Sequence, residues 1–359
     1  MKNRIFLVSN MYPSRKDPGY GIFVKNFERH AEKNGFVIVD KAVIEGKGIS
    51  ISQKVFKYIF FYYAIIAKGL RGDYDMIYAH YITHSALPLL LLRLVVNKPI
   101  VLNAHGDDVM TTSRVQHALQ IVVKRLLKYT NLLVVPSNFF ARKVRELYQI
   151  DERKIQVSPS GGVDTNLFSP FRKEIQDKVV IGYVSRIEES KGWRTFIKAI
   201  SKLQHDPTYQ NRFKALVVGD GSDKLKLLDE LELSGLQLFV SYKGFIEQQK
   251  LPDVLNELDV LVFPTLLYES LGLVGLEAMA CGVPVIGSRR GGLTDYIRES
   301  VNGFYIDPDD QEELYRKLVG FLSLSLAERK TLQANARSTA LQYSSDTVSQ
   351  ALMTRLQTI

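Results

Sequence analysis

Two glutamates, Glu269 and Glu277, bracket a glycine-bearing stretch in the second half of this chain. The run 259–263 before them predicts a buried strand, so Glu269 follows the carboxyl end of a strand, where open α/β sheets bind ligands. A helix that begins near Leu271 would turn its free N–H groups toward the same place, which suits a phosphate or sugar hydroxyls. The pattern therefore predicts a nucleotide-sugar site. The simpler alternative is that Glu269 caps the helix and Glu277 is a solvated helix residue.

The residues that follow carry a longer motif. Residues 276–292 read Leu-Glu-Ala-Met-Ala-Cys-Gly-Val-Pro-Val-Ile-Gly-Ser-Arg-Arg-Gly-Gly. This stretch resembles the retaining glycosyltransferases of family 4, whose signature is Glu, seven residues, Glu, and a helix ending in Gly-x-Pro-Val. The resemblance runs from about 182 to 307 and more thinly over the first half. It implies retaining transfer from a nucleotide sugar, with Glu269 at the sugar and Glu277 accepting hydrogen bonds from the ribose hydroxyls.

Two cations, Arg186 and Lys191, lie five residues apart, the first after a predicted strand and the second at the start of a helix. Such a pair is commonly a feature of the surface, but here it is similar to the Gly-Arg and Lys-Gly pair of the family. The resemblance implies that both residues neutralise the donor diphosphate. Departure of a nucleoside diphosphate develops negative charge, which fixed cations stabilise in a water-poor cleft.

Other family matches lie in loops after predicted strands. His105, in Asn-Ala-His-Gly, resembles the His-Gly motif, which implies a hydrogen bond to the donor sugar near the reacting carbon. Otherwise it is a loop histidine with ordinary hydrogen bonds. Leu271 and Asp295 depart from the residues that are usual in the family. The remaining matches are glycines and apolar residues at turns that the resemblance places around the nucleotide sugar: Gly21, Gly219, Phe245, Ile246, Gly272 and Leu273.

His80 and His84 have the i, i+4 spacing of a metal-binding pair. No third ligand is evident, and the family commonly works without an obligatory metal. We therefore expect residues 78–84 to form an acceptor-facing loop. We expect no metal site and no obligatory cofactor, with the nucleotide-sugar donor acting as co-substrate.

Along the sequence, short apolar runs alternate with amphipathic stretches. This pattern is typical of βα units and parallel sheets, which would position the residues named above. This α/β pattern and the resemblance predict a GT-B fold, with two Rossmann-like domains whose parallel sheets face an interdomain cleft. The acceptor-side domain is expected at 1–165, joined by a C-terminal helix at about 345–359, and the nucleotide-sugar-binding domain at 170–344. Twelve strands are predicted, near 4–8, 36–43, 75–79, 99–103, 131–135, 155–158, 178–184, 213–219, 238–242, 259–263, 283–287 and 303–306.

The composition fits two ordinary soluble domains, since 46% of the 359 residues are apolar and 24% are charged. The single cysteine, Cys281, rules out an internal disulfide framework. No run is long enough for a membrane span, and the chain enters a strand at residue 4 without a signal peptide. Together these features predict a cytoplasmic protein.

The net charge of +9 is uneven along the chain. Residues 1–170 hold 24 Lys and Arg against 13 Asp and Glu, or +11, which leaves −2 for the remainder. This asymmetry suggests an anionic partner for the first half. Two predicted amphipathic helices carry much of this positive charge. The first has a basic stripe formed by Lys54, Lys57, Lys68 and Arg71, and the second has one formed by Arg114, His117, Lys124, Arg125 and Lys128.

These stripes favour contact with an anionic membrane surface, which would lie on the inner side of the cell membrane. The alternative is that they are ordinary solvent-exposed sides of the helices. The expected acceptor is then a lipid-linked saccharide of polysaccharide biosynthesis. A nucleic-acid partner is not expected, because no recognised binding module is present. Two alternatives stay open: a transferase for a soluble acceptor, and a nucleotide-sugar 2-epimerase on the same fold.

Overall fold

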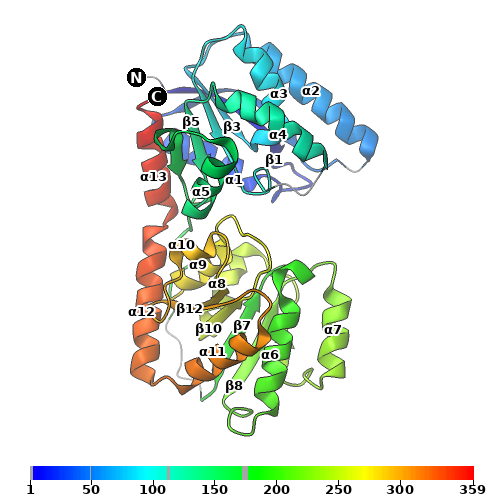
Figure 1. The fold of residues 1–359 in the computed structure, drawn as a ribbon, viewed down its shortest axis with the longest axis vertical. Helices are drawn as coiled ribbons and strands as arrows, with labels where there is room; N and C mark the ends of the chain where they lie inside the picture. Colours follow the sequence, from blue (N-terminus) through cyan, green and yellow to red (C-terminus); the bar gives the residue numbers. More distant parts are fainter. Residues whose placement is uncertain (1–2, 49, 111–113, 172–176) are drawn as a thin grey trace. The chain divides into compact units, whose positions relative to one another are not determined.

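The computed structural model describes residues 3–48, 50–110, 114–171 and 177–359, and for residues 114–118 the backbone alone. The chain folds as two compact units (Figure 1). Unit 1 comprises Met1–Gly162 and Asp346–Ile359, and unit 2 comprises Val163–Ser345. The division falls inside the turn-rich stretch 158–170 of the sequence.

Unit 1 is built on a six-stranded parallel sheet with the order β2-β1-β3-β4-β5-β6. Successive strand residues face opposite sides, so that Phe6 and Val8 join one core and Ile5 and Leu7 join the other. Helices α2 to α5 cover the first side, and α1 and α13 cover the second. The strands are β1 (Arg4–Tyr12), β2 (Val37–Glu45), β3 (Met76–His80), β4 (Ile100–Asn103), β5 (Leu132–Val135) and β6 (Ile155–Val157). The helices are α1 (Ile22–Lys33), α2 (Ile51–Gly69), α3 (Ile82–Arg93), α4 (Arg114–Leu127), α5 (Asn138–Tyr148) and α13 (Ser345–Leu356), with a short 3-10 turn η1 (Glu152–Lys154).

Unit 2 is a second six-stranded parallel sheet, with the order β12-β11-β10-β7-β8-β9. Helices α6, α7 and α11 pack on one side, where Trp193 is among the largest fully buried side chains, and α8, α9 and α12 pack on the other. The strands are β7 (Val179–Val184), β8 (Phe213–Val218), β9 (Val240–Tyr242), β10 (Val260–Phe263), β11 (Val285–Ser288) and β12 (Gly303–Ile306). The helices are η2 (Glu189–Lys191), α6 (Trp193–His205), α7 (Lys224–Leu233), η3 (Gln248–Lys250), α8 (Leu251–Glu257), α9 (Leu273–Ala280), α10 (Leu293–Tyr296), α11 (Gln311–Ser323) and α12 (Leu326–Gln342).

The predicted α/β fold with parallel sheets is confirmed, and each of the twelve predicted strands overlaps one of β1 to β12. The prediction of a loop at 78–84 was wrong. His80 ends β3 and His84 lies in α3, because Tyr81 adopts a left-handed conformation (φ 60°) that turns the strand into the helix within one residue. The helix expected from Leu271 begins two residues later, at the start of α9.

The basic side of α2 lies partly against the protein. Lys57 Nζ donates a hydrogen bond to the Glu45 carbonyl (2.5 Å), while Lys68 and Arg71 lie 2.9 Å and 3.5 Å from the Asp40 carboxylate. Lys57 and Lys68 are therefore only partly exposed, because β2 and the loop after it offer oxygen acceptors along that side.

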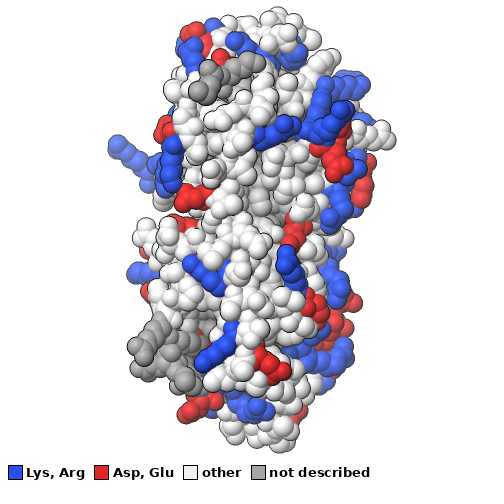
Figure 2. Space-filling view, turned by 90° about the vertical axis from the view of Figure 1, so that its left-hand side faces the viewer, with Lys and Arg blue, Asp and Glu red and all other residues white. Residues whose placement is uncertain are grey.

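The stripe on α4 is different, since Lys124, Arg125 and Lys128 are exposed. The side chains of Arg114 and His117 lie outside the described residues. On the face drawn in Figure 2, Lys and Arg side chains are interspersed with Asp and Glu. In the part of the chain that the structure describes, no helix is both long enough and apolar enough to cross a membrane.

Candidate active site

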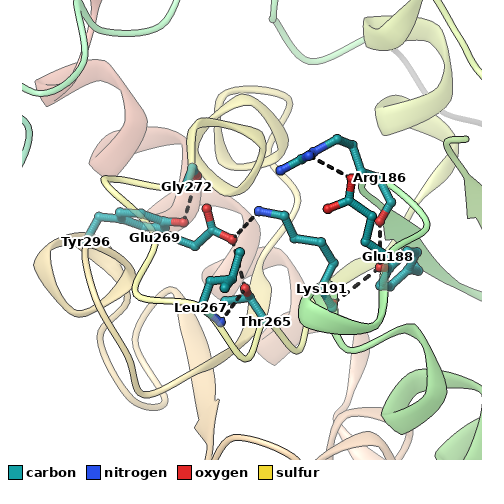
Figure 3. Close-up of polar contacts among 9 residues, drawn as sticks. Arg186, Glu188, Lys191, Thr265, Leu267, Glu269, Gly272 and Tyr296 are labelled. Atoms are coloured by element: carbon teal, nitrogen blue, oxygen red, sulfur yellow. Dashed lines mark hydrogen bonds and ion pairs between the residues drawn. The ribbon is translucent and has the colours of Figure 1, made fainter. Parts of the chain in front are cut away.

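A buried ion pair joins Lys191 and Glu269 in unit 2 (Figure 3). Lys191 ends η2, after β7, and Glu269 lies in the loop after β10, the strand next to β7 in the sheet. The Lys191 Nζ lies 2.6 Å from the Glu269 Oε1, and the Thr265 hydroxyl donates to the same oxygen at 2.8 Å. The two charged side chains are only 10% and 14% exposed. Two of the four predicted catalytic residues are thus brought together at the carboxyl ends of adjacent strands.

The main chain around Lys191 has little room to move. Gly192 has φ 73°, and a Cβ atom there would lie 1.8 Å from the Pro264 carbonyl oxygen. The Leu266 N–H donates to the Ser190 carbonyl (2.9 Å), which fastens η2 to the loop after β10. The glycine after the lysine is therefore required by the close approach of two loops, and this approach sets the lysine beside Glu269.

The loop that carries Glu269 is held by a pair of glycines. The Gly292 N–H donates to the Glu269 carbonyl (2.8 Å), and a Cβ atom on Gly291 would lie 2.7 Å from the Glu269 nitrogen and oxygen. Gly272 precedes α9 with φ 81°, and its carbonyl accepts a hydrogen bond from the Tyr296 hydroxyl at 3.0 Å. Tyr296 was not predicted as a site residue, since nothing in its local sequence links it to a loop 24 residues earlier.

Helix α9 presents its first residue, Leu273, beside this loop, and no acidic residue occupies its first turn. The N-terminal end of a helix attracts anions through its backbone N–H groups. The predicted roles of Gly272 and Leu273 in phosphate or sugar binding rest on this position.

Glu277 lies one turn further along α9, where its carboxyl group is buried and has a raised pKa. Burial raises the pKa of this carboxyl to about 7, and a 3.3 Å hydrogen bond from the Gln248 side chain opposes the shift. Gln248 comes from η3 and was not predicted. The expected alternative of a solvated helix residue is wrong for Glu277, because only 8% of the residue is exposed.

Arg186 lies outside the buried pair. Its side chain is 64% exposed, and its Nη1 lies 2.7 Å from the Glu188 carboxylate. Figure 3 shows the guanidinium next to Glu188, while the Lys191 side chain extends to Glu269. The two predicted diphosphate ligands therefore differ in environment, one accessible and the other enclosed.

The loops after β8 and β9, which carry further predicted site residues, contact each other. Gly219 has φ 136°, and a Cβ atom there would lie 1.8 Å from the Ser185 carbonyl oxygen. Its N–H donates to the Gly244 carbonyl (2.8 Å), which links the two loops. Of the next two residues, Phe245 is 73% exposed and Ile246 is partly buried against the core.

The predicted site residues of unit 1 are His105 and Gly21. His105 follows β4, and its Nε2 lies 3.1 Å from the Nδ1 of His80 at the end of β3. The Tyr81 ring stacks on His105 with a centroid separation of 5.0 Å. Burial lowers the pKa of His105 to about 3 and that of His80 well below its usual value, so both rings are neutral at pH 7. Gly21, with φ 71°, approaches Met11 so closely that a Cβ atom would lie 2.5 Å from its carbonyl carbon.

Asp108 organises this region, although it was not predicted. Its carboxylate accepts hydrogen bonds from the N–H groups of Ile82, His105 and Gly106 at 2.8 to 3.0 Å. Burial raises the pKa of this carboxyl to about 6, and these backbone donors oppose the rise. The spacing His-Gly-Asp-Asp is the local signal that could have indicated a loop-closing aspartate.

We expect Asp108→Ala to destabilise unit 1 by about 2 to 4 kcal/mol, because three buried N–H donors would lose their acceptor. Asp107→Ala, at the exposed neighbouring position, is the matched control and should change stability by less than about 0.5 kcal/mol. Urea unfolding of both variants checks this. Equal midpoints would show that the Asp108 carboxylate does not hold the loop.

Among the residues that the structure describes, no group of three or more His, Cys, Asp or Glu side chains is arranged to hold a metal ion. His80 and His84 thus have no third ligand of these types within the described ranges. His84 instead packs against the Tyr58 ring of α2, with centroids 5.2 Å apart.

The chain matches two family models that adjoin each other. Residues 22–167 match the family described as Glycosyltransferase Family 4, and residues 166–339 match Glycosyl transferases group 1. Among solved structures, it is similar to sucrose-phosphate synthase from Thermosynechococcus elongatus (TM-score 0.78, 20% identity, covering 99% of this chain and 98% of that one). It is equally similar to HepE from Anabaena in complex with UDP (TM-score 0.78, 19% identity, covering 99% and 100%).

Curated relatives are similar over part of their length. The 2-deoxystreptamine N-acetyl-D-glucosaminyltransferase of Streptomyces fradiae is 29% identical over 250 residues, which cover 67% of this chain and 58% of that protein. The D-inositol 3-phosphate glycosyltransferase of Geodermatophilus obscurus is 29% identical over 295 residues, which cover 74% and 62%. The matches thus span about six-tenths of these relatives. Since the two family models together account for residues 22–339 and the fold agrees, the chain belongs to the GT-B glycosyltransferases of the family 4 and group 1 type.

Proposed function

We propose that this protein is a retaining glycosyltransferase that moves a hexose from a nucleotide-sugar donor to a lipid-linked saccharide in polysaccharide biosynthesis. The observation that carries the proposal is the buried contact of Lys191 with Glu269 at the carboxyl ends of β7 and β10. One side chain can stabilise the negative charge of a leaving diphosphate, and the other the positive charge that develops on the sugar. The family to which the chain belongs supports the same reaction class.

In the proposed reaction, the bond between the anomeric carbon and the diphosphate oxygen breaks, and a bond to the acceptor hydroxyl oxygen forms on the same face of the sugar. A donor phosphate oxygen takes the hydroxyl proton. Lys191 and Arg186 hold the diphosphate, while Glu269 positions the sugar. His105, kept neutral by burial, donates or accepts a hydrogen bond at the sugar without change of charge near pH 7.

The donor is proposed to be a UDP-sugar, with a GDP-sugar as the alternative. HepE, which shares the fold, has been solved with UDP and with UDP-glucose. We expect UDP to raise the unfolding temperature of unit 2 more than GDP, ADP or UMP. A nucleotide at 100 times its dissociation constant stabilises a protein by about 2.7 kcal/mol. Thermal unfolding with each nucleotide checks this, and a stronger effect of GDP would reverse the donor assignment.

A transferase for a soluble acceptor is the second candidate. Two relatives are named for 2-deoxystreptamine and D-inositol 3-phosphate, which are small and polar acceptors. Transfer from the preferred donor to such a compound, compared with transfer to a lipid-linked saccharide, distinguishes the two. A nucleotide-sugar 2-epimerase would instead convert the donor with no acceptor at all, and the enclosed Lys191 beside Glu269 favours transfer over that reaction.

A further inference from the structure

Helix α2 of unit 1 has two apolar faces, and only one of them is packed. Phe61 and Ile65 point into the core beneath the helix and are no more than 2% exposed. A second set at helical spacing lies on the other side of the helix, with its members 55% to 81% exposed: Ile51, Val55, Phe56, Ile59, Phe60 and Tyr63. An exposed apolar group of this size on one side of a helix marks an interaction site.

The neighbouring helix also exposes apolar side chains. Helices α2 and α3 lie side by side in Figure 1, and Gly69 of α2 packs against Leu92 of α3. The outer side of α3 and the residues after it expose four more apolar side chains, between 39% and 76%: Leu87, Leu91, Leu94 and Val95. Exposed apolar side chains that occur singly are ordinary, but six of them at helical spacing on one side of α2 mark an interaction surface.

The charges on α2 itself are of one sign, while Asp17 and Glu45 lie near its lysines. Helix α2 contains three lysines and no acidic residue. Lys54 is exposed in its first turns and lies against Gly48, in the loop after β2 that also exposes Lys47. The segment around Asp17, which the Lys47 N–H contacts at 3.0 Å, adds two exposed cations, Arg15 and Lys16.

We propose that this apolar face of α2 inserts into the interfacial layer of an anionic lipid bilayer, with the cations at its N-terminal end against the headgroups. A helix with aromatic and aliphatic side chains on one side and lysines beside them has the composition of interfacial membrane helices. The exposed cations near one end of the face complement anionic lipid headgroups, which favours a bilayer over an uncharged partner surface. The inference rests on the proposed lipid-linked acceptor, since a membrane site brings the enzyme to such a substrate.

Binding by insertion of this apolar face differs in its salt dependence from binding by the basic stripes alone. Attraction between exposed charges decays within about 8 Å at physiological salt, so binding by charge alone disappears as salt rises. Insertion of phenylalanine and isoleucine side chains is not screened by salt. We therefore expect binding to anionic vesicles to weaken in high salt but to persist in part, and binding to neutral vesicles to be weaker.

The test is cosedimentation of the full chain with phosphatidylcholine vesicles that contain or lack phosphatidylglycerol. Because Phe56 and Phe60 are 66% and 62% exposed, the double variant Phe56→Ser/Phe60→Ser should fold normally. It should bind anionic vesicles at least about tenfold more weakly than the wild type. The matched control is Leu233→Ser/Leu238→Ser in unit 2, where two equally exposed apolar residues, at 86% and 88%, should be dispensable.

A second readout follows insertion directly. Phe56→Trp places an indole on the face, and its emission should shift to shorter wavelength with anionic vesicles, while the same vesicles leave the wild-type emission unchanged. Wild-type protein that does not bind anionic vesicles at low salt overturns the inference, as does unchanged binding of the serine variant. A dimer in solution that the serine variant abolishes, without vesicle binding, assigns the face to a second copy. Vesicle binding without any glycosyl transfer supports the inference and overturns the proposed function instead.

Discussion

Replacing Lys191 by alanine is expected to reduce turnover by about 100-fold or more, because the enclosed cation is assigned to charge that grows on the leaving diphosphate. Binding of the donor should suffer less than turnover. Initial rates at saturating donor and acceptor measure the effect. Lys198→Ala, an exposed lysine on the following helix, is the matched control and should retain wild-type turnover.

The structure also requires a check on folding, since the alanine leaves the Glu269 carboxylate buried beside only the Thr265 hydroxyl. The double variant Lys191→Met/Glu269→Gln removes both charges and should be no less stable than the single variant. Arg186→Ala, at an exposed position, leaves no buried charge, and we expect a comparable loss of turnover from it with an unchanged unfolding temperature. Wild-type turnover in both Lys191→Ala and Arg186→Ala would disprove the assignment to the leaving group.

At pH 8, where the Glu277 carboxyl is mostly ionised, Glu277→Gln is expected to weaken nucleoside diphosphate binding by about 1.5 to 3 kcal/mol, because a neutral amide replaces a charged acceptor for the ribose hydroxyls. Glu277→Ala should weaken it at least as much. Calorimetric titration measures both variants. Glu232→Gln, exposed on α7, is the matched control, and an unchanged dissociation constant in Glu277→Gln would remove Glu277 from the site.

The same substitution should have the opposite effect on the unliganded protein. The pKa of Glu277 is about 7 when folded and about 4.5 as a free side chain, so the folded state holds a proton that the unfolded state loses between these pH values. The contribution of this group to stability is full below pH 4.5 and is lost as the pH rises through 7. At pH 8, Glu277→Gln should therefore be more stable than the wild type by about 2 to 3 kcal/mol, and near pH 4.5 by little. Urea unfolding at the two pH values decides this.

The sequence predicted the strands well because strands of a covered parallel sheet are buried on both sides and read as short apolar runs. It also placed Glu269 after a strand and Lys191 at the start of a helix. It could not predict that they touch, because 78 residues separate them and their contact depends on which strands are neighbours in the sheet. Gln248 and Tyr296 could not be predicted for the same reason, because each contacts the candidate site from an element that is distant in the sequence.

The orientation of α2 could not be deduced from the sequence for a different reason. The helical projection of α2 has two apolar faces, and it does not show which of them packs against the core. The basic residues between the two faces are compatible with either orientation. The end of β2 and the loop after it determine the orientation of the helix, because carbonyl groups there accept hydrogen bonds from the Lys57 ammonium. Similarly, the spacing of His80 and His84 could not reveal the left-handed Tyr81 that separates a strand from a helix between them.

Trp193 is the single tryptophan of the chain, and it lies fully buried only two residues after Lys191. The intervening Gly192 lies against the Pro264 carbonyl, so the indole is attached to the part of the backbone that carries Lys191. Light absorbed selectively by tryptophan therefore excites one chromophore at one known place. The wild-type protein thus carries its own optical label beside the proposed donor site, and we expect nucleotide binding there to change its emission without an attached dye.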